Sequence, residues 1–142
     1  MEKMDKDTRS RIVLEKFPPL DQLKGIDLDQ RARAAGETLV FDDRIKTHQL
    51  RNVFSAIEKI RSIYQQKKKY NDDLETLLVL LKPKLAYAAG RQRSVRHHLF
   101  PFVENAIDAV VDKGATDKDK AIGNFFALLE SVVGYHKYYE NQ

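Results

Sequence analysis

Apolar residues recur every three or four positions along almost the whole chain, which is the period of an amphipathic α-helix. With only six Gly and four Pro, the sequence has little of the punctuation that separates β-strands, and it has almost no alternating β-branched runs. The pattern therefore predicts an all-α protein. Because the connections are short and no repeat or linker divides the chain, we expect a single domain, a compact bundle of five or six helices.

Three helix starts can be read from capping residues followed by apolar stripes. Asp27 is expected to cap the first secure helix, which buries Leu28, Ala32, Ala35 and Leu39. Thr47 is expected to cap the second, which runs to about residue 67 with the stripe Leu50, Val53, Phe54, Ile57, Ile60 and Tyr64. Asn71, followed by two acids that suit the positive helix end, caps the third, with the stripe Leu74, Leu77, Leu78 and Leu81.

Proline and glycine are expected to divide the second half of the chain. Pro83 should break or restart a helix that ends at Gly90, and Pro101 should kink or restart one that ends at Gly114. Thr116 and the acid three residues later match a capping box. The final helix is apolar on two faces and is expected to be central, with the buried residues Ile122, Phe125, Phe126, Leu129, Val132, Val133, His136 and Tyr139.

The segment at the start of the chain looks less ordered. Residues 1–17 are mostly polar and precede Pro18 and Pro19, so we expect residues 1–26 to form a tail, in part helical, rather than a core element, and residues 27–142 to form the domain. This segment lacks the apolar core of a secretory signal, and no later apolar run reaches the ~18 residues of a membrane span. The chain has no Cys, so disulfides and thiolate metal sites are excluded and a cytoplasmic location is expected.

The charges are unevenly distributed. The chain has 25 Lys and Arg against 21 Asp and Glu, a net charge of +4, yet residues 76–103 contain no acid at all. This acid-free segment carries five basic residues: Lys82, Lys84, Arg91, Arg93 and Arg96. An ordinary solvated surface would explain them, because basic side chains usually point outward. However, the missing acids, the small residues around Gly90 and the planar fork of Arg91 favour phosphate binding, and we predict a nucleic-acid contact here.

Catalytic chemistry has little support in the sequence. It contains no HExxH motif, Gly-rich phosphate loop or nucleophile elbow. The best enzymatic alternative is a metal-independent ribonuclease using His97, His98 or His136, because histidine titrates near neutral pH. We instead expect His97 and His98 to be a solvated pair and His136 to pack in the core. A metal site with His136 and Glu140 lacks a third ligand, so no enzyme activity, metal, cofactor or small-molecule substrate is predicted.

Two further interpretations concern binding. Gly90 and residues 95–99 could form the turn and start of a recognition helix, which makes a helix-turn-helix DNA-binding regulator the alternative function. Near the end of the chain, Tyr135, Tyr138 and Tyr139 are expected to serve packing or a subunit interface, with Lys137 between them able to reach a phosphate.

Three segments together resemble one protein family: IKTHQLRNVF (45–54), LLKPKLAYAAGRQRSVRHHL (80–99) and LLESVVGYHKYY (128–139). They are similar to the small subunit of the type III-A CRISPR-Cas (Csm) effector complex, whose members share a Thr-x-x-(Leu/Ile)-Arg helix start, a Tyr-x-Ala-Gly-Arg run followed by Val-(Lys/Arg), and a terminal Glu-x-x-Val-x-Tyr-x-Lys-(Phe/Tyr)-Tyr. The chain departs from this pattern at Gly134, where the family often has Ala, and at Glu140, where Gly often follows the aromatic pair.

The resemblance implies a helical, non-catalytic antiviral-defence subunit that stacks in several copies beside the backbone subunits and near the large (Cas10-type) subunit. Such a subunit lies along the guide RNA and its captured target RNA, and target cleavage belongs to the backbone subunit. Its motifs carry Arg51, Arg91, Arg96 and Lys137 over as RNA-binding positions, while Lys82, Lys84 and Arg93 are added from the acid-free segment. A subunit that serves every guide must hold the sugar-phosphate backbone rather than read bases.

Overall fold

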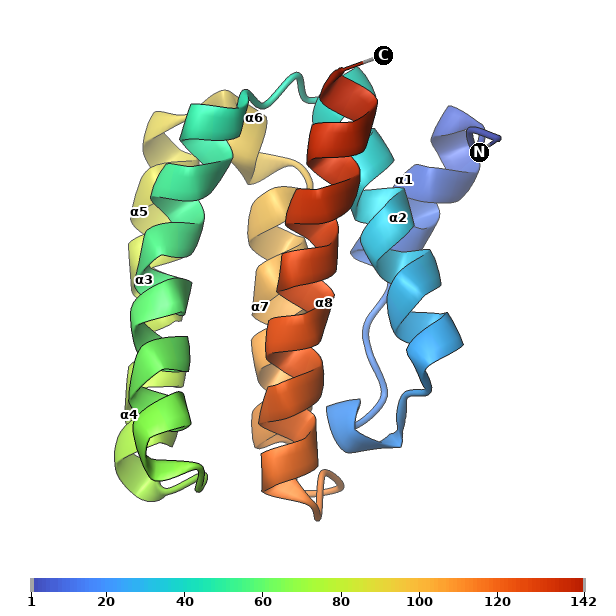
Figure 1. Cartoon of the computed structure of the whole chain (residues 1–142). Helices are drawn as coiled ribbons and strands as arrows, with labels where there is room; N and C mark the ends of the chain where they lie inside the picture. Colours follow the sequence, from blue (N-terminus) through green and yellow to red (C-terminus); the bar gives the residue numbers. More distant parts are fainter. Residues whose placement is uncertain (1, 142) are drawn as a thin grey trace.

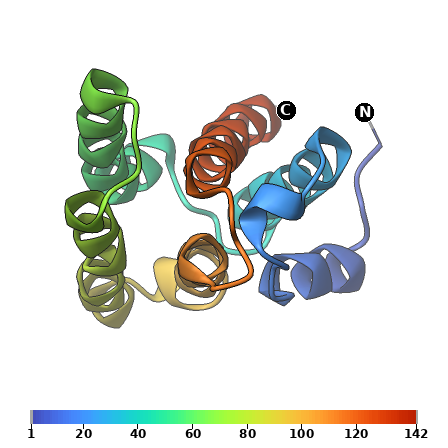
Figure 2. The ribbon, with the colours of Figure 1, turned by 90° about the horizontal axis from the view of Figure 1, so that it is seen from below.

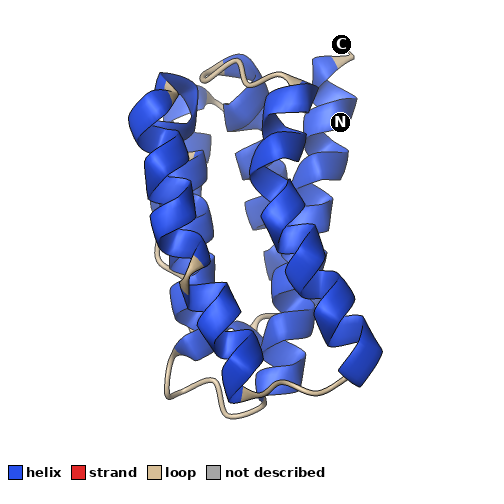
Figure 3. Cartoon of the chain, turned by 90° about the vertical axis from the view of Figure 1, so that its left-hand side faces the viewer, coloured by secondary structure: helices blue, strands red, loops and turns tan. Residues whose placement is uncertain are grey.

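The computed structural model describes residues 2–141, and these form helices joined by turns and loops, without a strand (Figures 1 and 3). The elements, in chain order, are α1 (Lys6–Leu14), the 3-10 turn η1 (Leu20–Gln22), α2 (Gly25–Phe41), α3 (Thr47–Lys67), α4 (Asp72–Val79), α5 (Leu81–Arg91), α6 (Arg93–Arg96), α7 (Leu99–Val111) and α8 (Lys118–Glu140). The predicted all-α bundle is confirmed. Within the described residues, no helix has the length and apolar character needed to span a membrane.

The helices are arranged in three groups, a central pair and one group on each side of it. Seen along the bundle, α7 and α8 lie in the middle, α1 and α2 lie on one side, and α3, α4 and α5 lie on the other (Figure 2). The most extensive helix-helix packing is between α2 and α8. As expected, α8 is central, and its buried residues are Ala121, Ile122, Phe125, Phe126, Leu128, Leu129, Val132, His136 and Tyr139.

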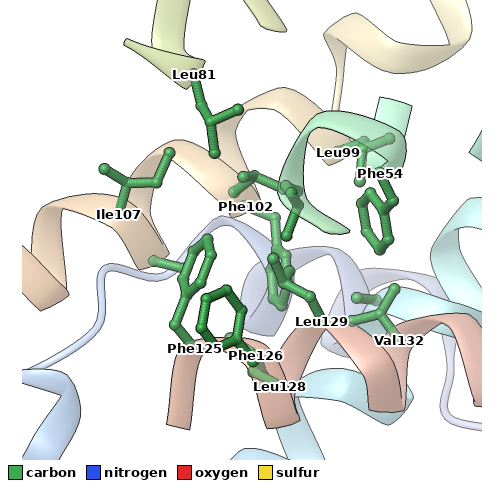
Figure 4. Packing of buried hydrophobic residues seen from close by; sticks show 14 of the residues in the cluster. Phe54, Leu81, Leu99, Phe102, Ile107, Phe125, Phe126, Leu128, Leu129 and Val132 are labelled. Carbon is green, nitrogen blue, oxygen red and sulfur yellow. The ribbon is translucent and has the colours of Figure 1, made fainter. Parts of the chain in front are cut away.

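The core joins all three groups. Phe54 of α3, Leu81 of α5, Phe102 of α7 and Leu129 of α8 all point into the interior shown in Figure 4, and each is 5% exposed or less. Aromatic contacts extend this core, because the ring of Phe17 meets the edge of Phe102 at a centroid distance of 5.5 Å. Burial of these large side chains, each of which stabilises the fold by about 1.5–3 kcal/mol, holds the outer helices against the central pair.

The two prolines in the second half of the chain lie in the first turn of a new helix, where no intrahelical N–H bond is lost. Leu80 separates α4 from α5, so Pro83 is the third residue of α5. His98 likewise precedes α7, and Pro101 is its third residue. Each proline therefore marks a restart, whereas Gly90 does not end its helix: α5 continues through Gly90 to Arg91.

Three predicted caps differ from the observed ones by a few residues. Asn71 caps α4 as predicted, by accepting a hydrogen bond from the N–H of Leu74 at 2.8 Å. The N-cap of α2 is Lys24, with Asp27 accepting from its N–H, and the N-cap of α3 is Lys46 rather than Thr47. Asp117, not Thr116, caps α8. In α2 and α3 the side chain three residues after the cap accepts from the N–H of the cap, and in α8 the carboxylate of Asp117 accepts from the N–H of Lys120.

Part of the segment before Phe17 is helical, as expected, but the expectation that it is not a core element is wrong. Residues Lys6–Leu14 form α1, which packs against α2, and Val13 is fully buried. The Arg9 guanidinium donates two hydrogen bonds to the Asp42 carboxylate, at 2.9 and 2.8 Å, and both side chains are about nine-tenths buried. Each group of this bidentate ion pair compensates the charge of the other, and an unpaired charge would be costly to bury. A mostly polar segment can therefore be part of the fold.

Leu77 was predicted in the buried stripe of its helix, and this prediction is wrong. Leu74 and Leu78 are buried at 3% and 0%, whereas Leu77 is 41% exposed. The reason is that α4 lies at the edge of the bundle and packs against its neighbours on one side only. Leu74 and Leu78 cover that side, and Leu77 lies beyond it.

Candidate nucleic-acid interface

The candidate interface begins on the outer face of α5. Leu85 and Ala89 are buried at 4% and 3%, so the residues between them on the opposite side of the helix must face solvent. Lys84, Tyr87 and Arg91 occupy that side at helical spacing, and all three are exposed. Arg91 Nη1 donates a hydrogen bond of 2.9 Å to the Tyr87 hydroxyl, and its Cζ lies 5.6 Å from the ring centroid. The sequence thus places one aromatic ring between two cations.

Arg96 joins this face from the single-turn helix α6. Its Nε donates to the carbonyl of Ala89 at 3.3 Å and its Nη2 donates to that of Gly90 at 3.4 Å. These carbonyls belong to the last turn of α5, which is the negative end of the helix dipole, so a guanidinium is favourable there. The geometry places the Arg96 side chain beside the end of the helix that carries Arg91. A guanidinium has five N–H donors, so both side chains keep donors for a ligand.

Arg93 lies on the same short connection and is also exposed. Together with Ser94 and His97 it lines a shallow depression whose other side is formed by Asp42 and Asp43. Arg9 forms an ion pair with Asp42, and the Asp43 carboxylate lies 2.9 Å from Nδ1 of His98. Arg93 itself forms no ion pair with a described residue.

Arg51 and Lys137 are exposed residues of two other helices. Arg51 is in the second turn of α3, and Lys137 is in the last turn of α8. The backbone N–H of Thr47 donates to Glu140 Oε2 at 3.2 Å and its hydroxyl donates to Glu140 Oε1, so the start of α3 is fixed to the end of α8. Figure 1 shows that these two helix ends, the end of α5 and helix α6 all lie at the same end of the bundle.

A shallow depression marks this junction, lined by Lys46, Thr47, His48, Arg51, Asn52 and Glu140. The hydrogen bond from the Thr47 hydroxyl is the main reason why the pKa of Glu140 is lowered. The ionised carboxylate offsets part of the positive charge contributed by Lys46 and Arg51. This side of the end is therefore less basic than the face formed by α5 and α6.

Lys82 differs from the other basic residues of the acid-free segment. Its ammonium forms an ion pair with the carboxylate of Asp108 on α7, and its side chain is 29% exposed. The expectation that this charge is unneutralised is therefore wrong, because the partner comes from outside the segment. By contrast, Lys84, Arg91, Arg93 and Arg96 form no ion pair with any residue that the structure describes. These four residues are called the basic face below.

The histidines do not form the expected arrangement. His97 is exposed, but His98 is not solvated: its Nδ1 lies 2.9 Å from the Asp43 carboxylate and its Nε2 lies 3.0 Å from Ser10 Oγ. His136 packs in the core as predicted, 1% exposed, with Nε2 at 2.6 Å from the carbonyl of Ile45. His136 is therefore too enclosed to reach an RNA substrate. Both ring nitrogens of His98 are engaged, and their contacts join α1 to the loop after α2.

The helix-turn-helix interpretation also fails. A recognition helix must expose one face to enter a major groove. The residues expected to start this helix form the four-residue α6 and the junction to α7, with Val95 and Leu99 buried at 0% and 1%. In α7, Asp108 is the one exposed residue, and it is already paired with Lys82, so this helix exposes no face that could enter a groove. The helix after the turn is a core element of the bundle.

The terminal tyrosines mainly serve packing, as expected. Tyr139 is 2% exposed and donates a hydrogen bond of 2.9 Å to Oε1 of the fully buried Glu37. Glu37 also accepts from the N–H of Met4 at 3.0 Å and pairs with Arg33 at 3.3 Å. This buried network, which connects the start of the chain, α2 and α8, was not found from the sequence, because its members come from three distant segments. Tyr138, in contrast, is 43% exposed.

Tyr87 lies on the same face of α5 as Lys84 and Arg91, as its spacing predicts. It is 66% exposed, while Tyr64, Tyr70 and Tyr135 are half-buried. Sequence reasoning did not find the hydrogen bond between its hydroxyl and Arg91.

Comparisons with known proteins point to one family. A family model described as Csm2 Type III-A matches residues 22–142. A curated protein of Enterococcus italicus, "CRISPR system Cms protein Csm2", is 31% identical over an alignment of 119 residues that covers 78% of this chain and 77% of that protein. No solved structure matches.

Proposed function

The chain belongs to the type III-A Csm2 family, the small subunits of type III-A CRISPR-Cas complexes, and we propose that in such a complex its basic face holds RNA by the sugar-phosphate backbone. The proposed ligands are the guide RNA and the captured target RNA. The proposed partners are the backbone and large subunits of the complex and further copies of this chain, and the proposed role is non-catalytic.

The observation that carries the proposal is the absence of internal neutralisation on the basic face. Lys84, Arg91, Arg93 and Arg96 lie on consecutive short helices, are exposed, and form no ion pair with a described residue. Four like charges close together raise the energy of the isolated protein modestly, and a polyanion relieves this repulsion. Arg51 extends the positive surface toward the start of α3, and Lys137 extends it toward the end of α8.

The chemistry of these groups fits sequence-independent binding. The major groove of A-form RNA is too narrow for side chains, so proteins hold such duplexes through phosphates and 2′-hydroxyls. Guanidinium groups bind phosphate oxygens in a bidentate manner, and helices provide a rigid support for them. Base pairing with the guide then supplies the specificity, and the protein contributes only affinity.

A single basic face of this size is expected to bind RNA weakly, and several copies along one strand would bind much more tightly. Once one copy is fixed in the complex, its neighbours meet the strand at a high effective concentration. Lys82 contributes less to this binding than the basic face does, because Asp108 already pairs with it. The surface is therefore suited to a repeated subunit.

The test is a charge reversal with a matched control. The variant Lys84→Glu/Arg91→Glu/Arg93→Glu leaves the Arg96 carbonyl contacts intact. The control, Lys67→Glu/Lys68→Glu/Lys69→Glu, makes the same change of charge at three exposed positions at the other end of α3. The measurement is RNA capture by the reconstituted complex as a function of salt concentration, after assembly has been checked by gel filtration.

Loss of three phosphate contacts to a single strand should flatten the log-log salt slope by about 2, since each contributes about −0.7. The control should keep the slope of the wild-type complex. Unchanged capture by the first variant, or equal losses in both variants, would refute the assignment of RNA binding to this face.

A further inference from the structure

Tyr87 is an aromatic side chain that the fold leaves uncovered. It is 66% exposed, and its only ring contact with a described residue is the one with Arg91. The hydrogen bond between Arg91 Nη1 and the Tyr87 hydroxyl, 2.9 Å long, joins the two side chains across one helical turn. This bond limits the rotation of the phenol, so less entropy is lost when the ring binds a flat ligand.

We propose that Tyr87 and Arg91 form a binding unit for one unpaired nucleotide, in which the base stacks on the Tyr87 ring and Arg91 binds the adjoining phosphate. The inference rests on the proposed RNA-binding function and adds the ligand class to it. Every base has a π-face, so stacking on a tyrosine is tolerant of sequence and is compatible with any guide. The remaining N–H donors of Arg91 are free for a phosphate.

The nucleotide must be unpaired for a geometric reason. In an A-form duplex each base is stacked between its neighbours, so a ring carried on the outer face of a helix cannot reach a base plane. Bases become available in single strands, at ends, or where they are displaced from the stack. Phosphate contacts alone do not distinguish these states from a duplex, whereas a stacking ring does.

The charges around Tyr87 favour a nucleotide over an apolar protein surface. Lys84 precedes the ring by three residues and Arg91 follows it by four, and neither pairs with a described acid. The apolar residues Leu77 and Leu80, exposed at 41% and 51%, lie on α4 and at its end, before this basic turn. A protein partner would be expected to cover these leucines together with the tyrosine, and the test below includes that outcome.

The experiment measures binding of the full chain to three labelled probes by fluorescence anisotropy at low ionic strength. The probes are single-stranded oligouridylate, an abasic ribose-phosphate oligomer of the same length, and a blunt-ended RNA duplex. Tyr87→Ala removes the ring, Tyr87→Phe keeps it without the hydroxyl, and Leu80→Ser changes the neighbouring apolar surface. Lys84→Glu tests phosphate binding separately.

Tyr87→Ala should weaken oligouridylate binding about tenfold, with the abasic oligomer and the duplex unaffected, and Tyr87→Phe should retain most of the affinity. The inference is overturned if Tyr87→Ala weakens all three probes equally or none of them. It is also overturned if Tyr87→Ala and Leu80→Ser abolish assembly with the other Csm subunits while RNA binding stays intact, because the ring is then a protein contact. The proposed function fails separately, if Lys84→Glu leaves binding of the abasic oligomer unchanged.

Discussion

Gly36 lies where two helices leave no room for a Cβ, and Gly36→Ala is the sharpest test of how the chain packs. An added Cβ would lie 2.6 Å from Cβ of Tyr135 and 3.1 Å from two backbone atoms, N of His136 and C of Tyr135. Real Cβ atoms essentially never show a 2.6 Å contact. The small residue is therefore needed where α2 crosses α8, the most extensive helix-helix contact of the fold.

The expected magnitude combines two opposing effects. Alanine is favoured over glycine inside a helix by about 1 kcal/mol. Overpacking a filled contact typically costs about 1–3 kcal/mol. The atoms that the new methyl group meets are backbone atoms and a Cβ of α8, not the ends of flexible side chains, so the two helices must move apart. We place the strain at the upper end of that range and expect Gly36→Ala to lower the free energy of unfolding by about 2 kcal/mol.

Gly134→Ala is the matched control. Gly134 also lies inside a helix, but an added Cβ there meets nothing within 4 Å. The same chemical change should then stabilise the protein by about 1 kcal/mol through helix propensity alone. Urea unfolding followed by circular dichroism would give both values. For a chain of this size 1 kcal/mol corresponds to about 4 °C in Tm, so the two variants should shift Tm in opposite directions.

The result that would refute this reasoning is specific. If Gly36→Ala unfolds at the same urea concentration as the wild type, or at a higher one, α2 and α8 do not approach as closely as described. A loss of stability in Gly134→Ala would show instead that the open space beside that residue is filled.

Three other predictions follow from single contacts. Glu37→Ala should destabilise the chain by about 1–3 kcal/mol in urea unfolding, because it leaves the buried donors around this carboxylate without an acceptor; unchanged stability would show that water replaces it. The hydrogen bond to Asp29 raises the pKa of Tyr135 to about 12. Because the folded protein holds this phenol proton more tightly than the unfolded chain does, the bond stabilises the fold fully below about pH 10, and this stabilisation is lost as the pH rises through 12. The amplitude of tyrosinate absorbance near pH 12 should therefore be smaller in Tyr135→Phe, while Tyr70, whose pKa is also raised, still ionises late. An unchanged amplitude in that variant would contradict the assignment. Asp108→Asn should free Lys82 and steepen the salt dependence of RNA binding by up to about 0.7, measured by anisotropy, and an unchanged slope would place Lys82 outside the interface.

The helices could be predicted because their signal is local. The stripe of α3 shows this, since Leu50, Phe54, Ile57 and Ile60 are all 5% exposed or less, as their spacing indicates. A residue and those three or four positions away lie on the same face of a helix whatever the rest of the chain does. The same spacing predicted that Lys84, Tyr87 and Arg91 share one face of α5.

Contacts between distant segments could not be predicted in this way. Ser10 and His98 are 88 residues apart, and the charge of Lys82 is met by an acid from α7 that its own segment lacks. Leu77 looks as buried as Leu78 in the sequence, and it is the edge position of α4 that exposes it. In each case the answer depends on which surface of another helix lies opposite.

The sequence by itself determined that this chain is helical, where most helices begin, and that one segment carries positive charge with no acid of its own. Only the tertiary structure decided which of those charges stay unpaired, that the first helix belongs to the core, and that Arg91 donates a hydrogen bond to the Tyr87 hydroxyl. The physical reason is that helix periodicity is fixed by neighbours one turn away, whereas burial and ion pairing are fixed by residues that meet only when the helices pack.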